Sequence, residues 1–412
     1  MRTHEMTLDV SNPRCLMELA DATADAAGLM DRLQWARLER MRGRLMEVLA
    51  KEEYGTLARS IRWIFQRMSA PRRARVLLSS ELCEYLIVVA GMETISQRTS
   101  TSSNSREAEL TRALVAIHDL MERECALAEL ANGKVSRFLR GTRRWRIDSP
   151  SGDCLAEKTD EGEWSVRAAP IIGGCIALDF DSPLARHHEE SSGVMSQRAL
   201  AFTGEERLGI KLKLEQAITK IDRAEPLYGA LIRNFVRRII LRKSHEFDDE
   251  GSRRFGSEHA PRQPGSLRLL NTHHPDLEVA ACMESLMHEA THNVLAAWEL
   301  THTFFVPTAC AHRVVSPWSG NQIPNASYIH AVFVYYICHR LLKLHLSNAT
   351  DLAFSERDHV RRRLAGCAVG FLIEQKLSSR LTTSSPLPEA ISQSIDLMQR
   401  KMKDEYRAGA LG

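Results

Sequence analysis

Residues 281–300 read ACMESLMHEATHNVLAAWEL. Apolar residues run through this stretch without a helix breaker, which predicts a long, uninterrupted helix that begins near Asp276. Within it, His288, Glu289 and His292 form a His-Glu-x-x-His pattern. Two histidines four residues apart lie on one helix face, about 6 Å apart along the axis, so both imidazoles can bind the same ion. The stretch therefore predicts a helix that carries a metal centre.

The segments around this helix are also mainly helical in pattern. Apolar residues recur near a period of 3.6 in residues 13–140 and again in 203–243, which indicates helices. Short, turn-separated segments rich in β-formers occupy 143–187, and LRLLN at 267–271 is typical of an edge strand. Residues 244–266 are expected to form an irregular connector. The predicted fold class is α+β, predominantly α-helical, with one small β-sheet.

We expect three consecutive regions. They are an N-terminal helical region at 1–142, a small β-rich segment at 143–200 and a helical catalytic region at 201–412. A net charge of +3 gives no general attraction to nucleic acid, and the basic clusters alternate with apolar helical positions, as on solvated helix faces. Nine scattered cysteines without a Cys-x-x-Cys pair are typical of a reduced, cytoplasmic protein. The chain shows neither a secretory signal nor a membrane-spanning run.

The third metal ligand decides the class of site. The zinc-peptidase extension of the motif fails, because Leu295 and Trp298 replace its glycine and final histidine. Glu299 lies on the right helix face, but seven residues beyond His292 is about 10 Å along the same helix, so support or a surface position is expected for it. His330 stands out because it opens an otherwise apolar helix, where an unsatisfied imidazole is costly to bury. The histidines that remain as candidates are 302, 312, 330, 339 and 345.

The motif helix and a later block, SPWSGNQIPNASYIHAVFVYY at 316–336, carry a family resemblance. Together they resemble the His-Glu-x-x-His type 2-oxoglutarate-dependent peptide β-hydroxylases, which modify ribosomally made precursor peptides. The resemblance implies that His288, His292 and His330 bind Fe(II), with Glu289 beside the metal. It also implies 2-oxoglutarate and O₂ as cosubstrates and a precursor peptide as substrate. Nitrogen ligands suit Fe(II) and Zn(II) alike.

One position departs from the family pattern. The family has an Arg-Pro pair before the third histidine, whereas this chain has Gln322-Ile323-Pro324. Arg313, just upstream of Ser316, is the candidate substitute for binding the distal carboxylate of 2-oxoglutarate. Trp318 and Phe333 are candidate pocket residues.

Two alternatives to the oxygenase stay open. A zinc metallopeptidase would use the same two histidines, with Glu289 as the general base for a zinc-bound water. A catalytically decayed peptide-binding protein would retain the fold without the chemistry, as the altered Arg-Pro position allows.

Overall fold

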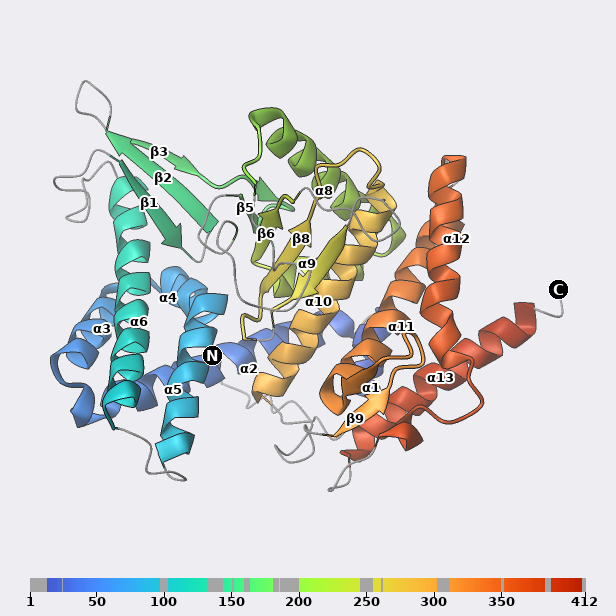
Figure 1. The fold of residues 1–412 in the computed structure, drawn as a ribbon, viewed down its shortest axis with the longest axis horizontal. Coiled ribbons are helices and arrows are strands. Elements are labelled where there is room, and N and C mark those ends of the chain that lie inside the picture. The colour runs from blue at the N-terminus through green and yellow to red at the C-terminus, as the bar shows by residue number, and fades with distance from the viewer. Residues whose placement is uncertain are drawn as a thin grey trace. The chain divides into compact units, whose positions relative to one another are not determined.

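Helices dominate the computed structural model (Figure 1). This result confirms the predicted α+β, predominantly α-helical fold class, although the strands form three small sheets. No helix in the described ranges is long and apolar enough to cross a bilayer. The structure describes residues 13–23, 25–96, 103–131, 144–149, 152–158, 164–180, 185, 200–244, 255–260, 262–301, 312–349, 352–381 and 387–409.

The chain divides into two compact units, neither of which is continuous in sequence. The first comprises 1–36, 212–235 and 274–412, and the second comprises 37–211 and 236–273. Helices α2 (Ala26–Ala50) and α8 (Gly204–Ala224) contribute residues to both units. The three consecutive regions expected from the sequence stay a prediction.

The first unit is built from helices and one hairpin. Helix α10 packs against α9, α11 and α12, while α1 packs against α13. Besides parts of α2 and α8, this unit contains α1 (Pro13–Ala20), α9 (Pro226–Phe235), α10 (Val279–Thr301), β9 (Arg313–Val315), β10 (Gln322–Pro324), α11 (Asn325–Asn348), α12 (Phe354–Ala368), the 3-10 helices η4 (Val369–Phe371) and η5 (Ser378–Arg380), and α13 (Glu389–Gly409).

Helix α10 is buried on almost every side. Its core residues include Met283, Leu286, Met287 and Trp298, each at most 1% exposed. A helix that is apolar nearly all round belongs in the centre of a packed unit. Between Ala281 and Glu299 the partly exposed residues fall on one stripe with helical spacing: Ala281, Ser285, His288, His292 and Glu299. The two histidines of the motif therefore lie on the one partly exposed stripe of this central helix, whereas Glu289 is buried.

A charged pair ties α10 to α12 one turn before His288. The guanidinium of Arg363 donates to both carboxylate oxygens of Glu284, at 2.7 Å from Nε to Oε2 and 2.6 Å from Nη2 to Oε1. This two-point geometry fixes direction as well as distance. Because Glu284 is buried, the pair holds α12 at a defined place beside the motif stripe.

The second unit combines helices with two sheets. Strands β1, β2 and β3 form an antiparallel sheet, and the five-stranded sheet has the order β4-β5-β6-β8-β7 with a parallel centre. Its elements besides α2 and α8 are η1 (Glu52–Tyr54), α3 (Gly55–Arg67), α4 (Ala70–Leu77), α5 (Ser80–Ser96), α6 (Ser103–Ala131), β1 (Arg144–Ser149), β2 (Gly152–Lys158), β3 (Trp164–Ala168), β4 (Ile171–Ile172), β5 (Ile176–Asp179), β6 (Arg238–Arg242), β7 (Gly256–His259) and β8 (Ser266–Leu270).

Three segments of this sheet differ from the sequence-based expectation. Arg238–Arg242, expected to continue a helix, is the fully buried central strand β6. Strand β8 lies between β6 and β7 and is buried throughout, so it is not an edge strand. The expected irregular connector contains strand β7 at 256–259. Central parallel strands are covered on both faces, so their sequences lack the alternation that marks a half-exposed strand.

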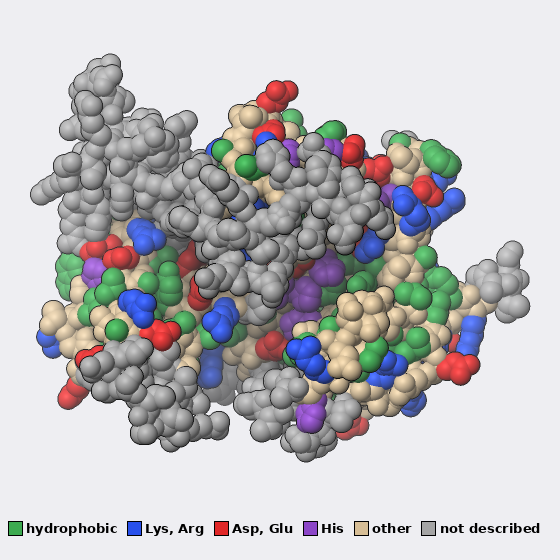
Figure 2. All heavy atoms as spheres, in the orientation of Figure 1, with side chains coloured by type: hydrophobic (Ala, Val, Ile, Leu, Met, Phe, Trp, Pro, Cys, Tyr) green, Lys and Arg blue, Asp and Glu red, His purple; other side chains and the backbone are tan. Residues whose placement is uncertain are grey.

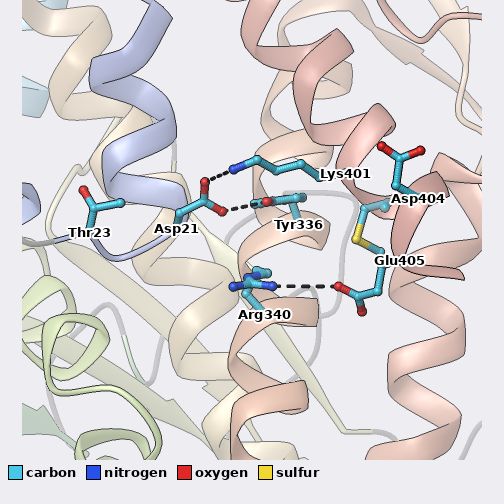
Figure 3. Close-up of a pocket in the computed structure, with 8 residues that line it drawn as sticks. Asp21, Thr23, Tyr336, Arg340, Lys401, Asp404 and Glu405 are labelled. Atoms are coloured by element: carbon cyan, nitrogen blue, oxygen red, sulfur yellow. Dashed lines mark hydrogen bonds and ion pairs between the residues drawn. The ribbon is translucent and has the colours of Figure 1, made fainter. Parts of the chain in front are cut away.

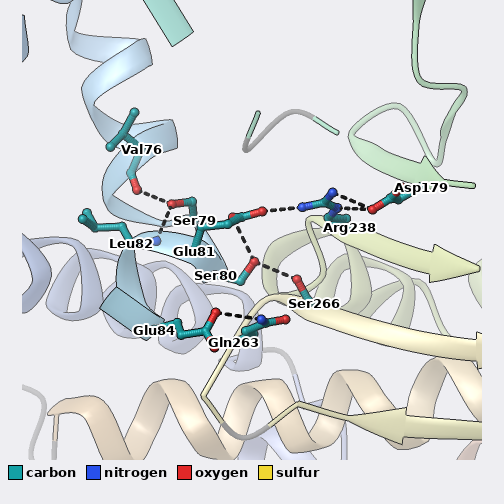
Figure 4. A network of polar contacts seen from close by, with 10 residues as sticks. All are labelled: Val76, Ser79, Ser80, Glu81, Leu82, Glu84, Asp179, Arg238, Gln263 and Ser266. Atoms are coloured by element: carbon teal, nitrogen blue, oxygen red, sulfur yellow. Dashed lines mark hydrogen bonds and ion pairs between the residues drawn. The ribbon is translucent and has the colours of Figure 1, made fainter. Parts of the chain in front are cut away.

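A buried cation links helix α5 to this sheet (Figure 4). Arg238 of β6 pairs with Asp179 of β5, with 2.8 Å from Nε to Oδ2, and also with Glu81 of α5. The side chains of Arg238 and Asp179 are 3% and 0% exposed. Ser80 of α5 adds a hydroxyl–hydroxyl bond of 2.7 Å to Ser266 of β8. The network satisfies charges that would be costly to bury alone.

We expect Arg238→Met to destabilise the protein by about 3–5 kcal/mol, because it leaves two carboxylates without their buried cation. The measurement is the free energy of unfolding from chemical denaturation. Arg42→Ala is the matched control, since Arg42 pairs with Glu39 on the surface and its loss should cost under about 1 kcal/mol. Equal destabilisation by the two variants would contradict the assignment.

Candidate metal centre

His288 and His292 lie one turn apart on the open stripe of α10. Their ring centroids are 5.1 Å apart. Figure 2 shows histidine side chains gathered at the surface over α10. Burial lowers the pKa of His288 to about 4, although 31% of its side-chain surface is exposed. The ring is therefore neutral at pH 7, and a neutral imidazole has a lone pair for a metal.

Helix α11 adds His330 to this pair. It begins directly after β10, and His330 lies in its second turn, where only 8% of the residue is exposed. The Nδ1 atoms of His330 and His292 are 3.0 Å apart. Two nitrogens bound to one ion at about 2.1 Å, at right angles, are also separated by about 3 Å. The spacing fits two ligands of one ion, as it fits a hydrogen bond between the rings.

Glu299 contacts the other nitrogen of His330. Its Oε1 lies 3.2 Å from Nε2 of His330. Metal-binding histidines commonly donate their second ring N–H to a carboxylate, which fixes the tautomer and the ring orientation. With the proton on Nε2, the Nδ1 lone pair of His330 faces His292. Support or a surface position was expected for Glu299 from the sequence, and His330 is the residue that it contacts.

Glu289 lies beneath the histidines. Its residue is 2% exposed, and its Oε1 is 4.0 Å from Nε2 of His288. Its charge is also one of the causes that raise the pKa of Cys338 on α11, after burial and nearer groups. The Glu289 carboxylate is thus buried next to His288.

The remaining histidine candidates have other surroundings. His339 Nε2 lies 3.1 Å from the Tyr406 hydroxyl, and His345 Nε2 lies 3.3 Å from Glu356 Oε1. Both rings therefore pack against α13 or α12. His312 is exposed ahead of β9, while position 302 lies outside the described residues.

Arg313 lies at the start of strand β9. It is exposed, and its Nη1 donates to the carbonyl of Gln322 across the hairpin at 3.1 Å. In the strand register it faces Pro324. The suggested role of Arg313 in binding an oxo acid stays a prediction.

A tighter group of possible ligands lies in the second unit. Among the described residues, the donor atoms of His118, Asp119 and Glu122 on α6 are the ones that lie within 4.8 Å of one another. The His-Asp-x-x-Glu spacing of this group was not among the predicted site residues. His118 Nε2 is 3.1 Å from the Ser60 hydroxyl, Asp119 is half exposed, and Glu122 is buried. The three candidate histidines are spread more widely, so sharing an ion requires rotation of at least one side chain.

A cavity of about 530 Å³ lies among α1, α11 and α13 (Figure 3). Its described lining does not include the three candidate histidines. Asp21 accepts a 2.6 Å bond from the Tyr336 hydroxyl and pairs with Lys401, while Arg340 lies 3.8 Å from Glu405. These charges largely satisfy one another, so we assign no ligand to this cavity.

Comparison of the chain with protein-family models gives no match, and neither does a search of curated proteins.

We expect His292→Ala to remove the bound metal while folding persists, because His292 lies between the other two rings. Metal per chain after anaerobic Fe(II) loading is the measurement, with circular dichroism as the check on folding. His312→Ala, at an exposed histidine, is the control and should bind metal like the parent. Stoichiometric metal in His292→Ala would remove this site assignment.

The contact between Glu299 and His330 gives a second prediction. His330→Ala should lose a ligand, whereas Glu299→Ala should retain one metal per chain at saturation with affinity lowered about 10- to 100-fold. Titration with Fe(II) under anaerobic conditions measures both. If Glu299→Ala cannot be loaded and His330→Ala can, the glutamate is the ligand and the three-histidine assignment is wrong.

Proposed function

We propose that this chain is an Fe(II)- and 2-oxoglutarate-dependent oxygenase that hydroxylates the β-carbon of a side chain in a ribosomally made precursor peptide. The observation that supports it most is the 3.0 Å approach of His330 to His292. His330 is the residue that the resemblance to the peptide β-hydroxylases implies as third ligand. The peptidase alternative would use the same two histidines, a third ligand, and Glu289 as general base.

The donor set fits the proposed metal. Three imidazoles suit Fe(II), and three protein ligands leave coordination positions for a two-point oxo acid and for O₂. When bound, the iron would supply the oxidising chemistry, with O₂ as the oxidant and 2-oxoglutarate as the co-substrate that is oxidised to succinate and CO₂. The fit depends on rotation of at least one of the three histidine rings, because their donor atoms do not all lie within 4.8 Å of one another.

The residues of this chain would hold the metal and orient the groups that bind it. His288 and His292 come from the open stripe of α10, and His330 comes from α11 with its tautomer fixed by Glu299. The apolar residues around α10 exclude water from below the site. Arg313 is our candidate for binding the distal carboxylate of 2-oxoglutarate, since a guanidinium stays charged and can bind a carboxylate at two points.

A zinc peptidase is the second candidate, and the place of Glu289 beside His288 is the observation in its favour. A general base must reach both the metal-bound water and the substrate. The Glu289 residue is only 2% exposed and also acts electrostatically on Cys338 in the interior. Its burial favours a role in the packing beneath the histidines.

We expect the parent protein, loaded with Fe(II), to convert 2-oxoglutarate to succinate in an O₂-dependent manner. Glu289→Gln should retain this conversion, because the proposed chemistry does not need Glu289 as a base, while His330→Ala should lose it. Quantified succinate is the measurement, and Zn(II)-loaded protein is the negative control. A precursor peptide should gain one oxygen atom. Peptide cleavage that disappears in Glu289→Gln, without succinate formation, would establish the peptidase instead.

A further inference from the structure

Trp318 is held rigidly in the turn between β9 and β10. Its Nε1 donates to the carbonyl of Cys367 at 2.9 Å, and its ring meets Phe371 edge to face at a centroid distance of 5.2 Å. Gly370 lies directly beneath the ring, where an added Cβ would be 2.2 Å from Cε2 of Trp318. Only a glycine leaves room for the indole there. The turn itself uses Gly320 at φ +73, a backbone conformation that favours glycine.

Tyr335 connects Trp318 to the His-Glu-x-x-His motif. Tyr335 of α11 stacks on Trp318 with ring centroids 4.7 Å apart and planes 15° apart. The same tyrosine meets His288 at 90° with a centroid distance of 6.2 Å. Gly370, Trp318, Tyr335 and His288 thus form one continuous series of contacts, which we call the aromatic wedge. Phe333, the other candidate pocket residue, is 2% exposed and belongs to the core.

His288 needs such a support more than the other two histidines. Glu299 orients His330, and His330 in turn contacts His292. His288 makes no hydrogen bond to any residue that the structure describes, and its nearest carboxylate, Glu289, is 4.0 Å away. The terminal torsion of a histidine has a broad minimum. Without a wall beside it, this partly exposed ring would sample several orientations.

We infer that Trp318, acting through Tyr335, is a positioning residue that sets the orientation of His288 for metal binding. This inference rests on the proposed function only in taking His288 as a metal ligand. It gives the Ser-Pro-Trp turn a specific role, which is to press Tyr335 against the motif helix. A supporting residue of this kind lowers the orientational freedom that metal binding must otherwise remove.

Paired glycine variants test the wedge. Gly370→Ala introduces a Cβ that Trp318 must move to avoid, whereas Gly366→Ala on α12 places its Cβ 3.8 Å from Arg363 Nη1, an ordinary contact. Co(II) is the probe, because its visible absorption reports ligand geometry and a titration gives its affinity. We expect Gly370→Ala to weaken Co(II) binding about tenfold or more and to change the spectrum. Gly366→Ala should match the parent.

Tyrosine variants keep the test decisive if Gly370→Ala does not fold. Tyr335→Phe keeps the ring and should restore the parent spectrum and affinity, while Tyr335→Leu should reproduce the weakened binding. A purely structural role would lower thermal stability in Tyr335→Leu without altering the Co(II) spectrum. Parent-like Co(II) binding by Tyr335→Leu therefore overturns the inference.

Different results would refute the proposed function and the aromatic wedge. A parent that binds Co(II) through His292 but forms no succinate with Fe(II) refutes the oxygenase and leaves the wedge standing. A parent whose Co(II) binding is unaffected by His292→Ala refutes the metal centre and the wedge together.

Discussion

The packing of α10 against α11 is the constraint on which the candidate site depends. Helix α10 is buried on every side but one stripe, so its histidines can meet other ligands only along that stripe. Helix α11 lies beside it and brings His330 to 3.0 Å from His292. The polar atoms of the stripe are costly to desolvate unless each gains a partner. The apolar core of the first unit thus determines where the side chains of His292 and His330 meet.

The sequence was sufficient for features that depend on local pattern. The motif helix, the existence of α11 and the mainly helical α+β class all follow from apolar periodicity and the absence of breakers, whereas α11 begins at Asn325, five residues before His330, which was expected to open it. Strand β6 could not be found this way, because its buried apolar run adjoins α9 and has no alternation. Burial in a parallel sheet removes the very signal on which strand prediction relies.

Features that depend on two helices at once were beyond the sequence. The sequence places Glu299 about 10 Å beyond His292 along α10, but its contact with His330 depends on how α11 lies beside α10. The same is true of Trp318, whose place is set by Gly370, 52 positions later in the chain. Nothing in the spacing of these residues indicates a contact, since loops of any length can close it.

The discontinuity of the first unit has a consequence for biosynthesis. Asp21, just after α1, pairs with Lys401 of α13 and accepts a bond from Tyr336 of α11 (Figure 3). These partners emerge from the ribosome long after α1 does. Asp21 therefore cannot complete these contacts until almost the whole of this sequence has been translated. A nascent chain arrested before α13 would therefore expose the face of α1 that α13 normally covers.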